Sequence, residues 1–368
     1  MNLLLSISNQ RSRFSAARAV LEQAVMEHAF PGAAYGVLLD GNIVLLDSIG
    51  NFTYESDSAA VTPETIYDLA SVTKVFATTS AAMLLFDRSI LDLDTPVGEI
   101  LPGFVVGNEH AAERAHVTMR MLLAHASGLP AYARLFEQHS SANALLRACL
   151  QMPLEAPPGT RADYSDLGFI LLGKALEVLS GDHLARFCHR EIFTPLGLSN
   201  TYFGPPPSLR TQIPPTVNDI EFRKRIIQGE VHDENASVLG GCSGHAGLFS
   251  NVPDVLTFAD CILAGGLTRT GYQLFQPSTV RLFATRQTEP DGTSRALGWD
   301  TPTEPSSSGK FFGPSSIGHL GYTGTSLWID PGRKLAVVLL TNRTWPDRAS
   351  KLIQQARPAF HDAISAEL

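Results

Sequence analysis

The strongest constraint on the fold is a pair of β-hairpin patterns at opposite ends of the chain. Near the N-terminus, two segments rich in β-forming residues meet at Asp40-Gly41, a dipeptide that favours a tight hairpin turn. Near the C-terminus, residues 326–330 and 335–341 flank a turn-forming Pro-Gly-Arg-Lys segment. The second of these arms is apolar throughout, which predicts a central strand of a sheet.

The segment between the two hairpins has a helical pattern that is broken by many prolines and glycines. Its clearest helix covers residues 167–179 and is followed by Gly181, a residue typical of the position just beyond a helix. The simplest architecture is an α+β fold in which one antiparallel sheet is built from both chain ends, is flanked by helices and carries an inserted all-helical region. We expect residues 1–80 and 235–368 to form the sheet region and residues 81–234 the insertion, with the functional cleft at their junction.

The composition argues against several classes of protein. The chain has 368 residues, 44% of them hydrophobic, and a net charge of −8, so it can bury a large core but has no basic surface for nucleic acid or anionic lipid. No segment has the length of a transmembrane helix, and the apolar run within residues 1–8 is too short for a signal peptide. The four cysteines form no C-x-x-C pair and are expected to be free thiols of a reducing compartment. We therefore expect a cytoplasmic protein, with the periplasm or the exterior as the alternative where an export signal has been removed.

A serine and a lysine three residues apart form the first candidate for a reactive site. The pattern occurs twice, as Ser71 with Lys74 and as Ser307 with Lys310. Ser307 lies in a loop rich in Ser, Gly and Pro, whereas Ser71 begins a long apolar helix that we expect to start at Val72. Positions i and i+3 share one face of a helical turn, and a helix N-terminus favours negative charge on the serine oxygen. Ser71 is therefore the predicted nucleophile of an acyl-enzyme, and Lys74 its proton acceptor.

The role of this lysine depends on its charge, because only a neutral amine accepts a proton. Burial lowers the pKa of a lysine, and the apolar helix behind Lys74 could provide such a shift. In the alternative interpretation, Ser71 is only a helix cap and Lys74 is an exposed residue of the first turn.

A second candidate lies just before the helix predicted at residues 167–179. Tyr164 is on a tight turn there, and a phenolate beside a lysine ammonium has a lowered pKa, so Tyr164 and Lys74 could share one proton. Asp166 is expected to cap the N-terminus of the helix. The alternative for Tyr164 is a packed aromatic side chain of the core.

A glycine-rich segment before the C-terminal hairpin supplies the third candidate. Residues 318–326 read Gly-His-Leu-Gly-Tyr-Thr-Gly-Thr-Ser and lead straight into the hairpin. Glycines such as Gly321 let the backbone approach a substrate closely, and a backbone N–H here could form an oxyanion hole with that of Ser71. A similar His-x-Gly pattern at His245 leads into a helix instead. We therefore assign the strand position to His319 and expect His245 to line the cleft from another side.

These three elements, in the order Ser-x-x-Lys, Tyr-x-Asp and His-x-Gly, resemble the serine β-lactamase and penicillin-binding-protein superfamily. The likeness covers nearly the whole chain and is to class C β-lactamases, D-alanyl-D-alanine carboxypeptidases and related carboxylesterases. Residues 122–130, Leu-Leu-Ala-His-Ala-Ser-Gly-Leu-Pro, also look like a helix and turn of that superfamily. The resemblance implies an α/β sandwich with a helical region and Ser71 as nucleophile. It further implies Lys74 and Tyr164 as the base network, and the N–H groups of Ser71 and Tyr322 as oxyanion hole.

Two residues depart from the pattern of the superfamily. Asp166 stands where the lactamases and transpeptidases usually carry an asparagine that contacts the substrate amide. His319 stands where many members carry a lysine that anchors a substrate carboxylate, a role that histidine fills only when protonated. Both departures argue against an efficient antibiotic-degrading β-lactamase and leave esterase or amidase chemistry open.

The segment at residues 231–250 looks like a subgroup of cell-wall-related carboxypeptidases and of exo-acting amidases that cut between N-acetylmuramic acid and L-alanine. Several of its polar residues converge beside a glycine-rich turn, among them His232, Asp233 and His245. We expect these three residues to bind substrate or to hold the loop, and metal ligation is the less favoured alternative. Neither a metal nor any other cofactor is predicted.

Together these observations predict a serine hydrolase that acts through an acyl-enzyme on an amide of a peptidoglycan-derived or D-amino-acid-containing peptide, as a carboxypeptidase or a muramyl-peptide amidase. The alternatives are a promiscuous carboxylesterase or a weak β-lactamase. A non-catalytic binding protein on the same scaffold is least favoured, because Ser71, Lys74 and Tyr164 are all present. The predicted partner is a small-molecule or peptide substrate, not nucleic acid or membrane, and the oligomeric state is left open.

Overall fold

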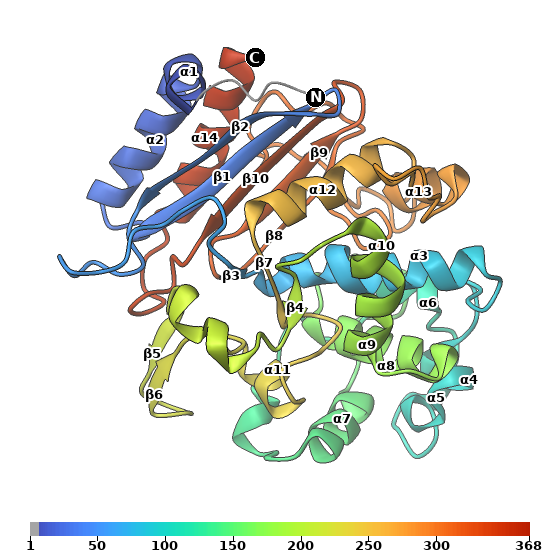
Figure 1. Ribbon diagram of the computed structural model, residues 1–368. Coiled ribbons are helices and arrows are strands. Elements are labelled where there is room, and N and C mark those ends of the chain that lie inside the picture. The colour runs from blue at the N-terminus through green and yellow to red at the C-terminus, as the bar shows by residue number, and fades with distance from the viewer. Residues whose placement is uncertain (1–6) are drawn as a thin grey trace.

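A five-stranded antiparallel sheet joins the two ends of the chain in the computed structural model, which describes residues 7–368. The strand order is β2-β1-β10-β9-β8, so an N-terminal strand pairs directly with a C-terminal one (Figure 1). The strands are β1 (Gly32–Leu39), β2 (Asn42–Gly50), β8 (Ile317–Leu320), β9 (Ser326–Asp330) and β10 (Leu335–Thr341). The predicted α+β fold with a sheet from both chain ends is confirmed. The first six residues of the N-terminal apolar run, 1–6, lie outside the described residues.

Both predicted hairpins are present, and the sequence explains their turns. Asp40 and Gly41 have φ values of 48° and 75°, and Asp and Gly tolerate this left-handed conformation better than other residues. Every residue of β10 is buried, as its apolar sequence predicts for a central strand.

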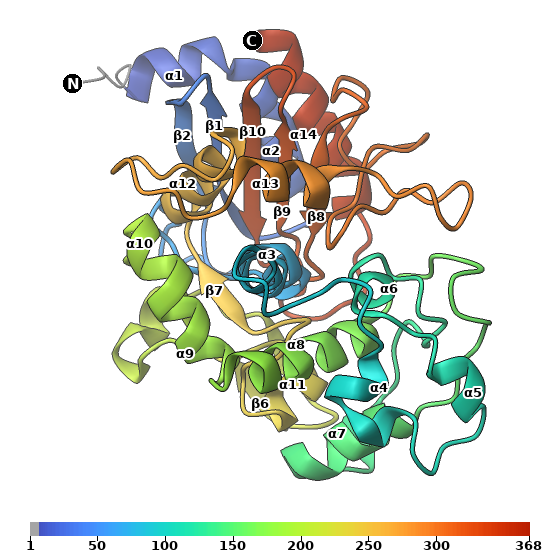
Figure 2. The same ribbon diagram turned by 90° about the vertical axis from the view of Figure 1, so that its right-hand side faces the viewer.

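Helices cover both faces of the sheet. On one face α2 and α14 pack side by side, and on the other α12 crosses β1 and β10 (Figures 1 and 2). The bounds of the helices around the sheet are α1 (Ile7–Arg13), α2 (Ser15–Met26), α12 (Val252–Leu263), α13 (Pro277–Ala284) and α14 (Ile353–Glu367). The sequence predicted a last helix from residue 348 with a break at Pro358. Instead α14 begins at Ile353 and runs through Pro358, because Phe360 and Ile364 beyond the proline are buried against the sheet.

The middle of the chain is mainly helical but not all-helical. Its helices are α3 (Ser80–Asp87), α4 (Val97–Ile100), α5 (Ala111–Arg114), α6 (Met119–Leu123), α7 (Ala142–Gln151), α8 (Asp166–Ser180), α9 (Leu184–Cys188), α10 (Thr194–Leu196) and α11 (Glu234–Val238). Short strands that the sequence analysis missed are β4 (Tyr202–Phe203), β5 (Val217–Asp219) and β6 (Arg225–Ile227).

One of these short strands ties the middle of the chain to the segment before Ser71. Strand β4 pairs with β7 (Leu248–Ser250), which also pairs with β3 (Tyr67–Asp68). Strands of two or three residues are too short to show the alternation by which a strand is recognised in a sequence. The division between the sheet region and the inserted region, at residues 80/81 and 234/235, stays a prediction. The first of these two boundaries falls inside a continuous helix.

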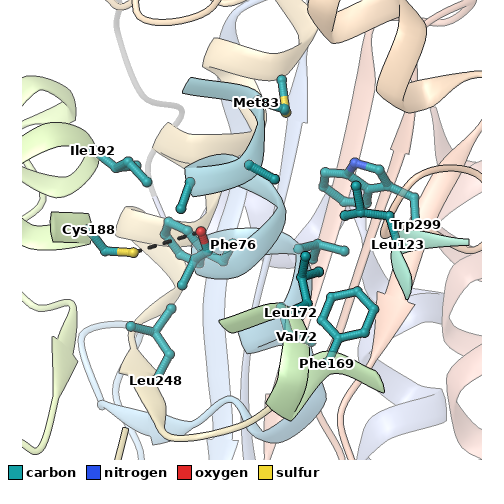
Figure 3. Packing of buried hydrophobic residues seen from close by; sticks show 14 of the residues in the cluster. Val72, Phe76, Met83, Leu123, Phe169, Leu172, Cys188, Ile192, Leu248 and Trp299 are labelled. Atoms are coloured by element: carbon teal, nitrogen blue, oxygen red, sulfur yellow. Dashed lines mark hydrogen bonds between the residues drawn. The ribbon is translucent and has the colours of Figure 1, made fainter. Parts of the chain in front are cut away.

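The helix that follows Ser71 is surrounded by hydrophobic side chains (Figure 3). Every residue from position 72 to position 85 is buried, which confirms the burial predicted from the apolar sequence. Phe76 stacks on Phe258 of α12 at a centroid distance of 4.3 Å, and the thiol of Cys188 lies 3.8 Å from the carbonyl oxygen of Ala77. The site at the start of this helix therefore rests on a support with little freedom to move.

Four histidines are buried as neutral rings. Burial is the largest cause that lowers the pKa of each ring, and the histidines are His125, His232, His319 and His361. Each folded-state pKa therefore lies below the ~6.5 of an exposed histidine. The neutral rings favour the folded state above pH 6.5. This stabilisation is lost as the pH falls below 6.5, because the unfolded chain then binds protons that the folded chain does not.

The state of the cysteines and the character of the helices can be compared with what the sequence predicts. All four cysteines are free thiols, and three of them are buried, as predicted. Among residues 7–368, no helix has both the length and the apolar character needed to cross a membrane.

Candidate active site

Ser71 lies at the start of the buried helix, on a turn wound more tightly than the predicted α-helix. A 3₁₀ turn covers Ala70–Val72, a π-helical stretch covers Lys74–Thr79, and α3 continues to residue 87. Ala70 has a φ of 46°, a left-handed conformation that costs an alanine about 1 kcal/mol or more. The carboxylate of Asp68 stabilises this turn by accepting the backbone N–H of Ala70 at 2.8 Å. The strained turn thus places Ser71 at the edge of the cavity.

Lys74 contacts Ser71, but its charge is not the one that the sequence predicted. Its Nζ lies 3.1 Å from Ser71 Oγ and 2.6 Å from Asp166 Oδ1, and the side chain is fully buried. Burial lowers the pKa of Lys74, but the negative charge of Asp166 together with Tyr164 more than offsets it, so the pKa is raised. The prediction of a lowered pKa is therefore wrong, and Lys74 is an ammonium in the resting state.

Asp166 holds this ammonium and does not cap the helix. The N-cap of α8 is Ser165, whose Oγ accepts the backbone N–H of Gly168 at 3.0 Å. Asp166 is the first residue of the helix, and its carboxylate faces Lys74 across 92 residues of sequence. Local spacing could not reveal this ion pair, because it forms only when α8 packs beside the helix that carries Lys74.

Tyr164 lies beside Lys74, with its ring centroid 4.8 Å from Lys74 Nζ. Burial and the charge of Asp166 raise the pKa of Tyr164 to about 12, although Lys74 and Ser71, which hydrogen bond to it, act in the opposite direction. The expected lowering of the tyrosine pKa is therefore wrong, and Tyr164 is a neutral phenol. It can orient Ser71 and Lys74, but it is not the group that carries the negative charge beside the lysine.

A residue that the sequence analysis did not single out supports this tyrosine. His125 lies under Tyr164 at a ring centroid distance of 4.7 Å, and its Nδ1 accepts the backbone N–H of Ser165 at 3.0 Å. It belongs to the helix and turn at residues 122–130, so the motif was noted while the role of its histidine was missed.

His319 lies on the edge strand β8 of the main sheet, which agrees with the strand position predicted for it. Its Nδ1 donates to the carbonyl oxygen of Leu320 at 2.8 Å, and its buried Nε2 has no hydrogen-bond partner among the described residues. Burial, with the charge of Lys74, lowers the pKa of His319 to about 3. At neutral pH the ring is therefore uncharged and offers an acceptor, and it cannot anchor a carboxylate as a lysine does.

The turn after β8 is fastened to the segment before Ser71. The hydroxyls of Thr323 and Thr325 donate to the carbonyl oxygens of Asp68 and Leu69 at 2.7 and 2.9 Å. Within residues 7–368, the backbone N–H of Tyr322 donates to no hydrogen-bond acceptor, and Tyr322 lines the same cavity as Ser71. This arrangement suits an N–H group that waits for a substrate oxygen.

Gly321 is required for this turn to lie so close to the segment before Ser71. A Cβ atom at Gly321 would lie 1.9 Å from Thr325 Oγ1 and 2.5 Å from the backbone oxygen of Leu69. Real Cβ atoms make no such contacts, so a larger residue would push the turn away from Ser71.

His245 contributes its backbone to Lys74 and its ring to Asp233. Its carbonyl oxygen accepts from Lys74 Nζ at 3.0 Å, its Nε2 lies 2.9 Å from Asp233 Oδ1, and its Nδ1 lies 2.8 Å from Ser243 Oγ. Both ring nitrogens are thus engaged with protein groups. In the part of the chain that the structure describes, no three His, Cys, Asp or Glu side chains converge as metal ligands would.

A cavity of about 650 Å³ brings these residues together and adds a group that the sequence analysis did not single out. It is lined by Ser71, Tyr164, Asp166, His232, His245, His319, Gly321 and Tyr322, which are predicted site residues. It is also lined by basic residues, namely Arg295, Arg343, Arg348, Lys351 and Arg357. Four of them lie within residues 343–357, a local cluster that the sequence shows but that was not recognised as part of the site.

A serine with a lysine at 3.1 Å, a carboxylate behind the lysine and an unengaged N–H in the same cavity are the parts that acyl transfer through a covalent intermediate requires. The fold and this site together define a serine hydrolase. The chain belongs to the beta-lactamase family, whose model matches residues 17–359.

Curated relatives share this family. A protein of Escherichia coli (strain K12) named "Putative D-alanyl-D-alanine carboxypeptidase" is 35% identical over 310 residues, which are 77% of this chain and 70% of the relative. A protein of the same name from Salmonella paratyphi B is 32% identical over 360 residues, covering 87% of this chain and 81% of the relative.

Solved structures show the same fold at lower identity. EstCE1, described as a hydrolase with promiscuous acyltransferase activity, has a TM-score of 0.78 at 22% identity, covering 97% of this chain and 99% of its own. A class C beta lactamase from Rhodobacter sphaeroides has a TM-score of 0.73 at 24% identity, covering 96% and 99%. A penicillin-binding protein homolog from Caulobacter crescentus has a TM-score of 0.76 at 18% identity, covering 100% and 99%.

Proposed function

We propose that this protein hydrolyses an amide bond of a peptidoglycan-derived or D-amino-acid-containing peptide through an acyl-enzyme on Ser71. The observation that carries the proposal is the chain of contacts from Ser71 Oγ to Lys74 Nζ at 3.1 Å and on to Asp166 Oδ1 at 2.6 Å. The names of the curated relatives support a peptide of the bacterial cell wall as substrate.

The raised pKa of Lys74 determines how the serine loses its proton. In our proposal, the ammonium of Lys74 first passes a proton to Asp166, which leaves a neutral amine within reach of Ser71 Oγ. That amine accepts the serine proton while Oγ attacks the carbonyl carbon, and the same proton later protonates the leaving nitrogen. Water then hydrolyses the ester to Ser71 by the same path in reverse. The aspartate that replaces the usual asparagine thus acts as the acceptor behind the lysine.

The backbone turn after β8 supplies the electrophilic part of the site. The N–H groups of Tyr322 and Ser71 point to an oxyanion hole, since both residues line the cavity and the turn is held to the nucleophile segment by two threonine hydroxyls. Such donors typically contribute about 3 to 4 kcal/mol to transition-state stabilisation.

A carboxylesterase is the second candidate, and the neutral His319 favours it. A substrate without a terminal carboxylate needs no cationic anchor on β8, and the pKa of about 3 leaves His319 uncharged. The structural likeness to EstCE1 is compatible with this alternative but shows only the fold.

Labelling of the serine tests the proposal directly. Intact-mass spectrometry after incubation with a fluorophosphonate and with a labelled penicillin should show one adduct, on Ser71, that disappears in Ser71→Ala. The matched control is Ser307→Ala, which removes the serine of the second Ser-x-x-Lys pattern and should label as the wild type does. Ser71→Ala should lose several orders of magnitude in turnover while staying folded.

The reaction products distinguish a peptide amidase from an esterase. Release of D-alanine or of a stem peptide from muropeptides supports the proposal, whereas turnover of p-nitrophenyl butyrate without action on muropeptides supports the esterase. If Ser71→Ala retained turnover near that of the wild type, Ser71 would not be the nucleophile.

A further inference from the structure

Arg357 of α14 is a buried cation without a partner of opposite charge. It is 6% exposed, and among residues 7–368 it forms no ion pair. Burial and the nearby charge of Arg343 lower its pKa to about 9, so the guanidinium is still charged at neutral pH. A buried charge without a counter-ion destabilises the folded state. The presence of this arginine therefore calls for a role other than stability.

The guanidinium donates to two carbonyl oxygens of the turn after β8. Arg357 Nη2 lies 2.6 Å from the oxygen of Gly321 and 3.0 Å from that of Thr325. Both oxygens also accept from within the turn, because the N–H of Gly324 donates to Gly321 at 3.1 Å and that of Gly321 donates to Thr325 at 2.8 Å. These two carbonyls would thus have partners without the arginine. Hydrogen bonding to the turn alone does not explain why a charge is buried here.

The carbonyl of Gly321 shares a peptide group with the N–H of Tyr322. This peptide is trans, and in a planar trans peptide the C=O and the N–H point in opposite directions. A guanidinium bound to the oxygen of Gly321 therefore keeps the N–H of Tyr322 directed away from itself, and that N–H has no acceptor within residues 7–368. Hydrogen bonds from charged donors are strong, and each bond in a chain polarises the next. The charge of Arg357 thus makes this N–H a better donor to a substrate oxygen.

A second arginine holds the peptide group on the other side of Tyr322. Arg343 Nε donates to the carbonyl oxygen of Tyr322 at 2.6 Å, and its guanidinium lies over the tyrosine ring at 4.2 Å from the centroid. The peptide groups before and after Tyr322 are therefore held by separate side chains. Of the two arginines, Arg357 contacts the group that carries the N–H of the oxyanion hole.

We propose that Arg357 is a positioning residue of the oxyanion hole, which fixes the peptide group between Gly321 and Tyr322 and strengthens its N–H as a donor to the substrate oxygen. The inference rests on the proposed acyl-enzyme function and adds how the hole is held in place. In this role Arg357 acts through the peptide group and not by contact with the substrate. Because negative charge on the substrate oxygen is greatest in the transition state, Arg357 affects kcat more than KM.

Selective isotope labelling observes this peptide group directly. Glycine labelled with ¹³C at the carbonyl and tyrosine labelled with ¹⁵N give a shared NMR signal only where tyrosine follows glycine, which occurs at Gly321-Tyr322 and at Gly271-Tyr272. Tyr272 is 53% exposed and lies outside the cavity lining, so the second pair is an internal reference. In Arg357→Met the Gly321 carbonyl signal should move upfield, because loss of a hydrogen bond at the oxygen shields the carbon. The reference signal should stay in place.

A pair of neutral esters measures the strength of the oxyanion hole. p-Nitrophenyl butyrate and its thiono analogue differ only in the atom that the hole binds, and sulfur is a weak acceptor. Arg357→Met should lower kcat for the oxygen ester about 10- to 100-fold while KM changes less than about threefold. The ratio of kcat/KM for the oxygen ester to that for the sulfur ester should fall at least about tenfold. Arg357→Lys keeps the charge and should recover most of this ratio.

His361→Gln is the matched control on the same helix. His361 is also buried, lies one turn further along α14, contacts the carbonyl oxygen of Ser307 at 3.1 Å and is outside the cavity lining. This variant should keep the wild-type ester ratio and both NMR signals. The urea midpoint of Arg357→Met should be no lower than that of the wild type, because the change removes a buried charge without a counter-ion. If Arg357→Met does not fold, Arg357→Gln, which keeps a neutral donor, should change the ratio in the same direction.

Three results would overturn the role of Arg357. The first is a Gly321-Tyr322 signal that does not move in Arg357→Met. The second is a lowered urea midpoint with an unchanged ester ratio, since the arginine would then be structural only. The third is a loss of activity confined to p-nitrophenyl succinate, because Arg357 would then bind a substrate carboxylate. Absence of Ser71 acylation in the wild type would count against the proposed function alone, since the NMR signals do not depend on turnover.

Discussion

The ion pair between Lys74 and Asp166 gives the sharpest prediction, because replacing Asp166 by asparagine changes one charge and little else. At a separation of 2.6 Å and an effective dielectric constant of about 20, the attraction between the two charges is about 6 kcal/mol. Burial lowers the pKa of Lys74 and is the largest single contribution to that pKa. In Asp166→Asn the charge of Asp166 would no longer oppose it. We therefore expect Lys74 to be neutral in Asp166→Asn at a pH where it is charged in the wild type.

The pH profile of acylation reports this change. In the wild type the proposed path starts from the charged lysine, which first passes its proton to Asp166. In Asp166→Asn the active form is the neutral lysine, so activity falls when Lys74 itself becomes protonated. The profile of Asp166→Asn should therefore gain an acidic limb that reports protonation of Lys74, and the wild-type profile should lack this limb.

The assay is the rate of Ser71 acylation by p-nitrophenyl butyrate between pH 4 and pH 10. Asp163→Asn is the matched control, because Asp163 lies on the same loop, is 47% exposed and pairs with Arg161 away from Lys74. Profiles of Asp166→Asn and wild type that coincide would refute the proposed proton path.

Three further predictions follow from the site and the core. Gly321→Ala should lower kcat about 100-fold, because the added Cβ would clash with Thr325 and Leu69 and move the oxyanion turn. A kcat within threefold of the wild-type value would show that the position of this turn does not determine the rate. His319→Gln should leave both limbs of the pH profile in place between pH 5 and pH 8, since the native ring is already neutral. Lowering the pH from 7 to 5 should remove about 2 kcal/mol of unfolding free energy for each buried neutral histidine, and urea titrations of His361→Gln should show a loss smaller by that amount.

The sequence predicts the sheet well because its signals are local. The Asp40-Gly41 turn and the apolar strand at residues 335–341 each carry their own chemistry, and both appear where expected. The proximity of Ser71 and Lys74 is predictable for the same reason, since three residues of helix bring them to 3.1 Å.

The charge states of the site could not be predicted from such local signals. The pKa of Lys74 depends on Asp166, which is 92 residues away. The local sequence favours a helix cap for that aspartate, but Ser165 provides the cap. The neutral state of His319 depends on burial against groups from several segments. Short strands such as Tyr202–Phe203 leave no periodic pattern at all.

The pairing of β1 with β10 has a consequence for how the protein is made. About 300 residues separate the two strands, so the sheet cannot close until nearly the whole chain has left the ribosome. The turn at Tyr322 joins two strands of that late sheet, so the hydrogen bonds from Thr323 and Thr325 to the segment before Ser71 also form late. A growing chain therefore holds its serine and lysine without an oxyanion hole. During this interval β1 exposes the edge that β10 later covers, and a nascent chain stalled at this stage is inactive and prone to aggregate.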